Sequence, residues 1–146
     1  MANFTIDNTI AEMIKNIDKL ANDEEIYEEM INAGTEIMKN SISQRASKHI
    51  VTGQMVNSLK TTKPTKNKDG DWVGRVKFSG SSGIQTTKSG KKYDITNWLK
   101  AFRIEYGRSN QRAQPFVRPA IQSSEKQIQQ KWEEIYDKRM SELKWT

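Results

Sequence analysis

Few residues of this chain could carry out catalytic chemistry. The 146 residues include one histidine, His49, and no cysteine. A catalytic triad, a zinc site or a thiolate nucleophile needs partners that this composition does not supply. His49 follows Lys48 at the end of a predicted helix, so we expect a surface or helix-capping residue rather than a catalytic base.

The carboxylates are the next candidates, because paired acids can hold Mg²⁺ or hydrolyse glycosidic bonds. Most of them lie at predicted helix starts or on polar helix faces, where they complement the helix dipole. Glu105 is the exception, since it falls on a predicted strand between Arg103 and Tyr106. We interpret it as half of an ion pair or as an interface contact. The sequence therefore predicts no catalytic centre, no metal and no cofactor.

Positive charge is concentrated in the middle of the chain. The net charge is +6, but residues 1–59 carry a net −4 and residues 60–118 a net +10. Such a segment can meet nucleic acid or an acidic protein surface, or it can be a solvated lysine-rich region. No Gly-rich phosphate-binding motif accompanies it. Aromatic and basic residues alternate over 72–78, as on a stacking platform for bases, although any amphipathic strand shows the same alternation.

The elements that would position these residues are mostly helical. Apolar residues at three- and four-residue steps predict a first helix over about 6–20, a second over 23–46 and a long last helix from Pro119 to the end of the chain. A short helix is expected near 55–59. Because no run approaches the ~18 apolar residues of a membrane span and the first residues do not resemble a signal peptide, we expect no contact with a membrane.

Period-two alternation predicts the strands. It covers residues 72–78 and 102–107, and a turn at 67–70 would connect the first of these back to a strand near 59–63. Residues 79–92 are rich in Ser, Gly and Lys and predict a flexible basic loop. We therefore expect a single α+β domain over 1–146. In it, a small antiparallel sheet of about three to four strands is packed by the N-terminal helices and the long C-terminal helix.

Two segments resemble a known family. Residues 103–109 (RIEYGRS) and 113–121 (AQPFVRPAI) resemble a strand that ends in Glu-aromatic-Gly, followed by a Pro-Phe-x-Arg-Pro-Ala turn into the last helix. Upstream, residues 52–59 (TGQMVNSL) resemble a Thr-Gly-x-Leu element after a long helix. This order is similar to that of the putative tail-component family of long-tailed phages, whose members are neck or tail-completion proteins. Arg108 and Met55 depart from the usual Thr and Leu.

The resemblance covers about residues 8–143, and it implies a structural virion protein without enzymatic activity, made in the bacterial cytoplasm. It implies a homo-oligomeric ring, expected to be a hexamer or dodecamer, at the head–tail connection. Its partners would be head-closure or connector proteins and tail-tube or tail-terminator proteins, with passive contact to DNA in the lumen. The alternative from composition is a basic nucleic-acid-binding module.

We expect the subunit or partner contacts to involve three groups of residues. The first is the acidic start of the second helix, which would meet the basic 60–118 region of a neighbour. The second is the Glu-aromatic-Gly and Pro-Phe-x-Arg-Pro corner, in which Phe116 would fill the joint between sheet and helix and Arg118 would hold a carboxylate. The third is the basic loop, at the lumen or against the next ring. The residues are Glu25, Glu29, Glu105, Tyr106, Arg108, Arg112, Phe116, Arg118, Lys88, Lys91 and Lys92.

Overall fold

The computed structural model describes residues 8–48 and 53–142, and within them the chain is α+β. The elements follow the order α1 (Asn8–Ala21), α2 (Glu24–Ala46), α3 (Gly53–Asn57), β1 (Leu59–Thr61), β2 (Thr65–Lys66), β3 (Trp72–Val73), β4 (Val76–Phe78), β5 (Ser81–Thr86), β6 (Lys92–Thr96), α4 (Asn97–Tyr106) and α5 (Val117–Glu142). The predicted fold class and the three main helices are therefore confirmed.

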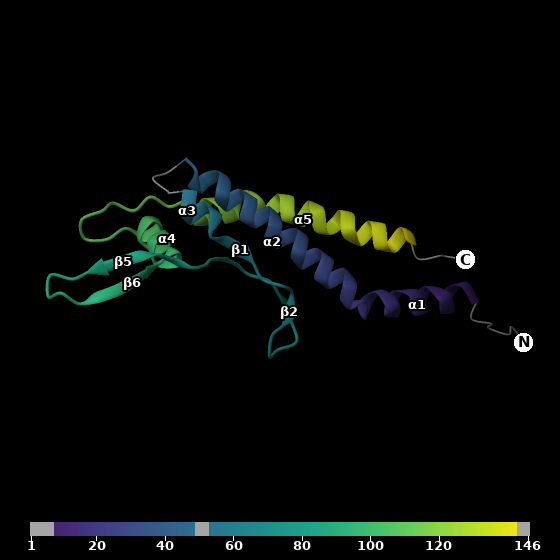
Figure 1. Cartoon of the computed structure of the whole chain (residues 1–146). Helices are drawn as coiled ribbons and strands as arrows, with labels where there is room; N and C mark the ends of the chain where they lie inside the picture. Colours follow the sequence, from purple (N-terminus) through teal and green to yellow (C-terminus); the bar gives the residue numbers. More distant parts are fainter. Residues whose placement is uncertain (1–7, 49–52, 143–146) are drawn as a thin grey trace, which may run out of the picture.

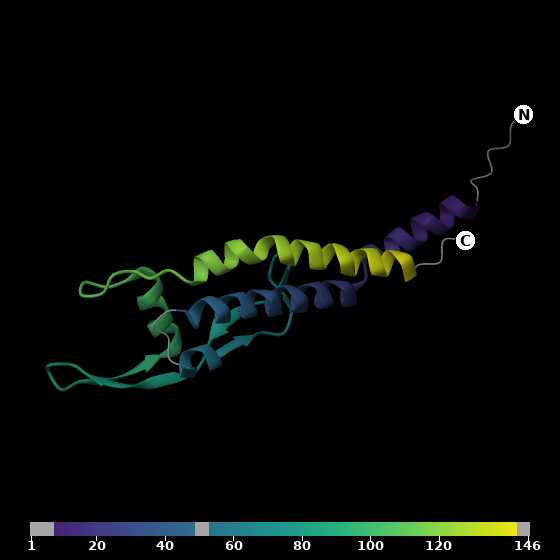
Figure 2. The same cartoon turned by 90° about the horizontal axis from the view of Figure 1, so that it is seen from above.

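Helices α2 and α5 form the body of the molecule and run antiparallel, side by side (Figures 1 and 2). Asp23 caps the N-terminus of α2 by accepting a hydrogen bond from the Glu25 amide at 3.1 Å. The two helices approach closely at Gly34, where an added Cβ would lie 3.2 Å from Nε1 of Trp132. That same indole nitrogen donates to the Met30 carbonyl at 2.6 Å, which fixes the rotation of α5 against α2.

The strands form three separate antiparallel pairs, β1–β4, β2–β3 and β5–β6, rather than one sheet of three or four strands. The first two pairs belong to one long hairpin whose tip is the predicted turn at 67–70. Pro64, which has no amide hydrogen to donate, lies in the break between β1 and β2. Between β3 and β4 the chain passes so close to α2 that a Cβ on Gly74 would lie 2.4 Å from Ile31 Cγ2. No larger side chain fits there without displacement.

The strand predicted over 102–107 is wrong, because these residues belong to helix α4. Thr96 caps its N-terminus through a 3.1 Å bond from the Leu99 amide. Gly107 ends it with φ +75, a conformation that favours glycine. The buried face of α4 consists of Asn97, Ala101 and Glu105, at four-residue spacing. Phe102 and Tyr106 are exposed while Ile104 packs partly against the core, and the alternation of these three residues along the sequence imitated a strand.

Half of the segment predicted as a loop over 79–92 belongs to strands instead. Strands β5 and β6 form a hairpin that extends from α4 away from the α1 end of the molecule (Figure 1). Its turn closes through the Gly90 amide and the Thr87 carbonyl at 2.9 Å, with Gly90 at φ +82. Ile84 is exposed and Ile95 is buried. The hairpin thus packs on the body only at its base, which left no clear apolar alternation in the sequence.

The core is small and divided between two clusters, in keeping with the low apolar content. The larger cluster joins α2, α3, α4, α5 and β1 around Phe116 and Met55. The smaller one lies where α1 meets α2 and the C-terminal half of α5, around Leu20, Ile26 and Ile135. In both clusters α5 packs against α2, so α5 contributes to the core at both ends of the molecule.

Candidate functional site

The corner between α4 and α5 is built around one buried carboxylate. Glu105, 5% exposed, accepts hydrogen bonds from three consecutive backbone amides. Its Oε2 accepts from Phe116 at 2.7 Å and from Val117 at 2.9 Å, while Oε1 accepts from Arg118 at 3.1 Å. A negative side chain from one helix therefore caps the positive N-terminal end of the next helix.

This cap accounts for every free amide at the start of α5. The carbonyl of Phe116 accepts the first intrahelical bond, from Ala120 at 3.2 Å, which makes Phe116 the N-cap residue. The amides of Phe116, Val117 and Arg118 all bond to Glu105, and Pro119 has no amide hydrogen. The two halves of the family-like segment, 103–109 and 113–121, are thus one structural unit.

Phe116 fills this corner from inside. Its side chain is 0% exposed and meets Phe78 of β4 edge-on, with ring centroids 6.1 Å apart. The predicted role of Phe116 in the joint is therefore correct. Its burial and that of Glu105 remove both residues from the predicted contact surface, because neither side chain is accessible to a neighbour. Glu105 is also not on a strand, and its main partners are backbone amides.

The exposed part of the corner is cationic and aromatic. The Arg118 guanidinium lies 5.1 Å from the centroid of the Tyr106 ring, and its Nε is 3.8 Å from Glu105 Oε1. This agrees with the predicted carboxylate partner of Arg118, which lies within the same subunit. Tyr106 continues a row of aromatic side chains along α4, of which the predicted strand over 102–107 included Phe102 and Tyr106 but not Trp98. Trp98 stacks on Phe102 at 5.4 Å, and Phe102 packs on Tyr106 at 4.7 Å.

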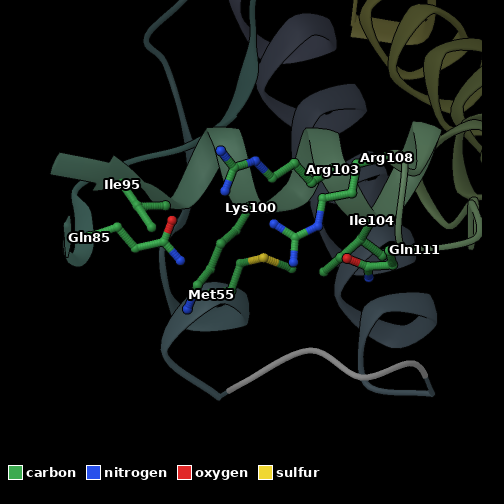
Figure 3. Close-up of a pocket in the computed structure, with 8 residues that line it drawn as sticks. All are labelled: Met55, Gln85, Ile95, Lys100, Arg103, Ile104, Arg108 and Gln111. Carbon is green, nitrogen blue, oxygen red and sulfur yellow. The ribbon is translucent and has the colours of Figure 1, made fainter. Parts of the chain in front are cut away.

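A small basic pocket lies on the other side of α4, at the base of the hairpin (Figure 3). It has a volume of about 200 Å³ and is lined by Lys100 and Arg103 of α4, by Arg108 and Gln111 of the following turn, and by Gln85 of β5. Within 8–48 and 53–142, no carboxylate makes an ion pair with any of these three cations. The pocket can therefore hold an anionic group. Of its cations, only Arg108 belonged to the predicted set.

The predicted residues of the hairpin are close together in the structure. Lys88 lies in the turn, and Lys91 and Lys92 follow at the start of β6; all three are exposed. Arg112 is exposed in the separate link that joins α4 to α5. The hairpin lysines thus form a positive tip at the far end of a projecting element (Figure 1), as a contact with a neighbour or with DNA would require.

Glu25 and Glu29 lie at the start of α2, away from the corner and the hairpin, and they pair within the chain. Arg139 of α5 reaches Asp23 at 3.4 Å, Glu29 at 3.6 Å and Glu25 at 3.7 Å. Lys66 also forms an ion pair with Glu24 of this turn. The acidic start of α2 is therefore partly neutralised within the chain. The sequence alone does not predict these ion pairs, because Arg139 lies more than 100 residues after its three acidic partners.

The described residues hold no other evident centre for catalysis or metal binding. They contain no group of three or more His, Cys, Asp or Glu side chains arranged to hold a metal ion. His49, for which we expected a surface or capping role, lies outside the described residues. No described helix is long and apolar enough to span a membrane.

Comparisons with family models, with curated proteins and with solved structures found no match to this chain.

Proposed function

We propose that this chain is a non-enzymatic structural subunit of the head–tail connection of a long-tailed phage. In this role it acts in the neck or in tail completion, as one subunit of a ring in the virion. Its neighbours are copies of itself, the head-closure or connector proteins and the tail-tube or tail-terminator proteins. The motif resemblance over 52–59 and 103–121 supports this proposal.

The observation that carries the proposal is the Glu105 cap. The resemblance rests on two short elements, and each alone is a weak indication. In this chain the carboxylate of the first element bonds to three amides of the second, so the pair has a definite physical purpose. A motif whose parts depend on each other marks a particular fold more strongly than two independent matches would.

The shape of the molecule also favours a part in an assembly. The hairpin and α1 project from opposite ends of the α2–α5 body (Figures 1 and 2). Large apolar side chains are exposed on α1 and on α4. Extended apolar surface on a protein with such a small core is typical of a subunit that is completed by neighbours.

The test is cryo-electron microscopy of particles from cells that lack this protein, beside wild type. A connector or completion role predicts full heads and finished tails that remain unjoined, or tails of abnormal length. Joining should return when the wild-type gene is supplied in trans, which excludes an effect on neighbouring genes. Normal, joined particles from the deletion strain would contradict the proposal.

The basic pocket favours a second candidate function, a nucleic-acid-binding module, because Lys100, Arg103 and Arg108 lack carboxylate partners among the described residues. Fluorescence anisotropy with a labelled DNA duplex tests it. Binding through phosphates should weaken steeply with salt, with a log–log slope of about −0.9 per phosphate neutralised. Arg103→Ser with Arg108→Ser should flatten this slope.

A matched control for that assay is the pair Lys126→Ser and Lys138→Ser, which removes the same charge from exposed positions on α5. If both double variants weaken DNA binding equally, net charge rather than the pocket is responsible. If wild type shows no salt-dependent binding, the nucleic-acid candidate fails and the ring subunit stands alone.

A further inference from the structure

Helix α1 exposes an apolar face that no residue within 8–48 and 53–142 covers. Ile10, Met13, Ile14 and Ile17 recur at three- and four-residue steps, so they share one side of the helix, and they are 43–62% exposed. Among the α1 side chains that the structure describes, only Leu20, at the end nearest α2, is buried. An amphipathic helix is stabilised in water mainly by burying such a face, and α1 does not bury it against the described part of its own chain.

A concave apolar surface exists elsewhere on the molecule. One groove of about 400 Å³ is walled by Trp98, Phe102 and Tyr106 of α4. A second, of about 760 Å³, runs between α2 and α5 past Trp132. Both grooves are lined by Val76 and Ile121, so they meet there and form one surface, which we call the apolar trough.

The chain's own α1 is directed away from the apolar trough. It is joined to α2 by only two residues, 22 and 23, and it extends beyond the end of α5 (Figures 1 and 2). The aromatic wall of the trough lies on α4, at the other end of the body. A helix held by so short a link at one end of the body cannot reach the wall at the other end, so an α1 that contacts the α4 wall must come from another subunit.

We propose that α1 of one subunit lies in the apolar trough of the next subunit. The proposal rests on the ring proposed above and names the surfaces that would build it. The two surfaces differ and are located apart, so the contact can repeat head to tail around a closed ring. A self-complementary contact between two α1 faces would instead stop at a dimer.

The dimensions and charges of the two surfaces are compatible. An α1 of 14 residues is about 21 Å long at ~1.5 Å per residue. The three aromatic side chains of the wall are 45–56% exposed. Each such side chain has a surface of roughly 150–250 Å², about half of which is still exposed here, so the three together offer about 300 Å². With α1 and the rest of the trough, the contact can reach the roughly 1,000 Å² expected of a specific interface.

Charge at the edges points the same way. The α4 end of the trough is lined by Lys77 and Arg118, and its α2–α5 end is lined by the exposed Glu125. On α1, the exposed Asp18 follows Ile14 by four residues and therefore flanks the apolar face. A carboxylate beside the inserted face and cations on the rim of its receptor favour this orientation over a contact between two like surfaces.

Cysteine cross-linking tests the contact directly, because the natural chain has no cysteine. The double variant Ile14→Cys/Phe102→Cys places one thiol on each proposed surface, both at exposed positions. Oxidation of the purified protein should give a ladder of covalent oligomers on a non-reducing gel, ending at the ring number. Each single variant should stay monomeric, and a mixture of the two should stop at a dimer.

Two controls make the result decisive. Lys15→Cys/Phe102→Cys moves the first thiol to the neighbouring, polar side of α1 and should cross-link far less. Lys60→Cys/Lys77→Cys joins two residues paired across β1 and β4 and should close within one chain. Dimers from Ile14→Cys alone, or thiol loss without oligomers in the Ile14→Cys/Phe102→Cys protein, would overturn the proposal. So would no oligomer under conditions where the Lys60/Lys77 pair closes.

The outcomes separate this contact from the proposed function. Unjoined particles together with no ladder would leave the head–tail role in place and refute only the α1 contact. A ladder together with normal particles from the deletion strain would support the contact and refute the role.

Discussion

Replacing Glu105 with alanine should lower the free energy of unfolding more than the replacement of an exposed carboxylate would, because Glu105 holds the corner between α4 and α5 together. The substitution removes the carboxylate that accepts from three backbone amides, one of which belongs to the fully buried Phe116. A hydrogen bond to a charged group contributes roughly 1.5–3 kcal/mol, and loss of a helix N-cap typically costs about 1 kcal/mol. The Val117 and Arg118 amides are closer to solvent and can recruit water.

Together these terms predict a loss of about 3 kcal/mol in the free energy of unfolding. Glu105→Gln should lose about half as much, because the amide oxygen can still accept from Phe116 and Val117 while its NH₂ group opposes the Arg118 amide.

Urea denaturation followed by tryptophan fluorescence measures this loss. With an m-value of about 2 kcal/mol per molar urea, a 3 kcal/mol loss lowers the midpoint by about 1.5 M. Glu36→Ala is the matched control, because it removes an exposed carboxylate from α2 and should change stability by less than about 0.5 kcal/mol. If Glu105→Ala unfolds at the same urea concentration as Glu36→Ala, the carboxylate does not hold the start of α5 and the argument from the motif fails.

Three further variants test the packing around this corner and along α5. Gly107→Ala should destabilise the protein more than Gly70→Ala. Both glycines have positive φ, but a Cβ on Gly107 would lie 2.7 Å from a backbone nitrogen, whereas a Cβ on Gly70 would meet open space. Equal melting temperatures of the two variants would contradict this steric explanation. Trp132→Phe should cost about 1–2 kcal/mol in chemical denaturation, since it leaves a carbonyl of α2 without its indole donor; an unchanged midpoint would mean that this bond is not needed. Arg139→Ala should lower the free energy of unfolding by about 1 kcal/mol at low salt and by less in 0.5 M NaCl, because salt screens partly exposed ion pairs. A loss of stability that does not depend on salt would assign the effect to packing instead.

The sequence was a good guide to elements that bury a continuous apolar stripe. Helix α2 was predicted over 23–46 and α5 from Pro119 onwards, because the apolar stripe and the residues at the helix ends agree in both. Helix α4 was missed since its buried face is Asn97, Ala101 and Glu105, which no hydrophobic pattern reveals. Its ends were nevertheless visible, as Thr96 and Gly107 are a typical cap and stop.

The candidate site was only partly predictable for a similar reason. Arg118 was expected to hold a carboxylate and lies 3.8 Å from Glu105, but the stronger bonds of Glu105 are to backbone amides, which carry no sequence signal. The basic pocket depends on Lys100 and Arg103 lying three residues apart on a helix, and an extended strand would have sent them to opposite faces. Because the α4 residues were predicted as a strand, the basic pocket could not be predicted from the sequence.

The cap at the start of α5 also sets a rule for which substitutions the turn can accept. Glu105 recognises backbone amides, so the side chains of Val117 and Arg118 can vary without disturbing those bonds. Proline is the exception, because at 116, 117 or 118 it would delete one of the three donors. The two prolines of this turn, Pro115 and Pro119, lie immediately on either side of that window. A library randomised over 116–118 and selected for folding should thus recover many residues at 117 and 118 but no proline at any of the three.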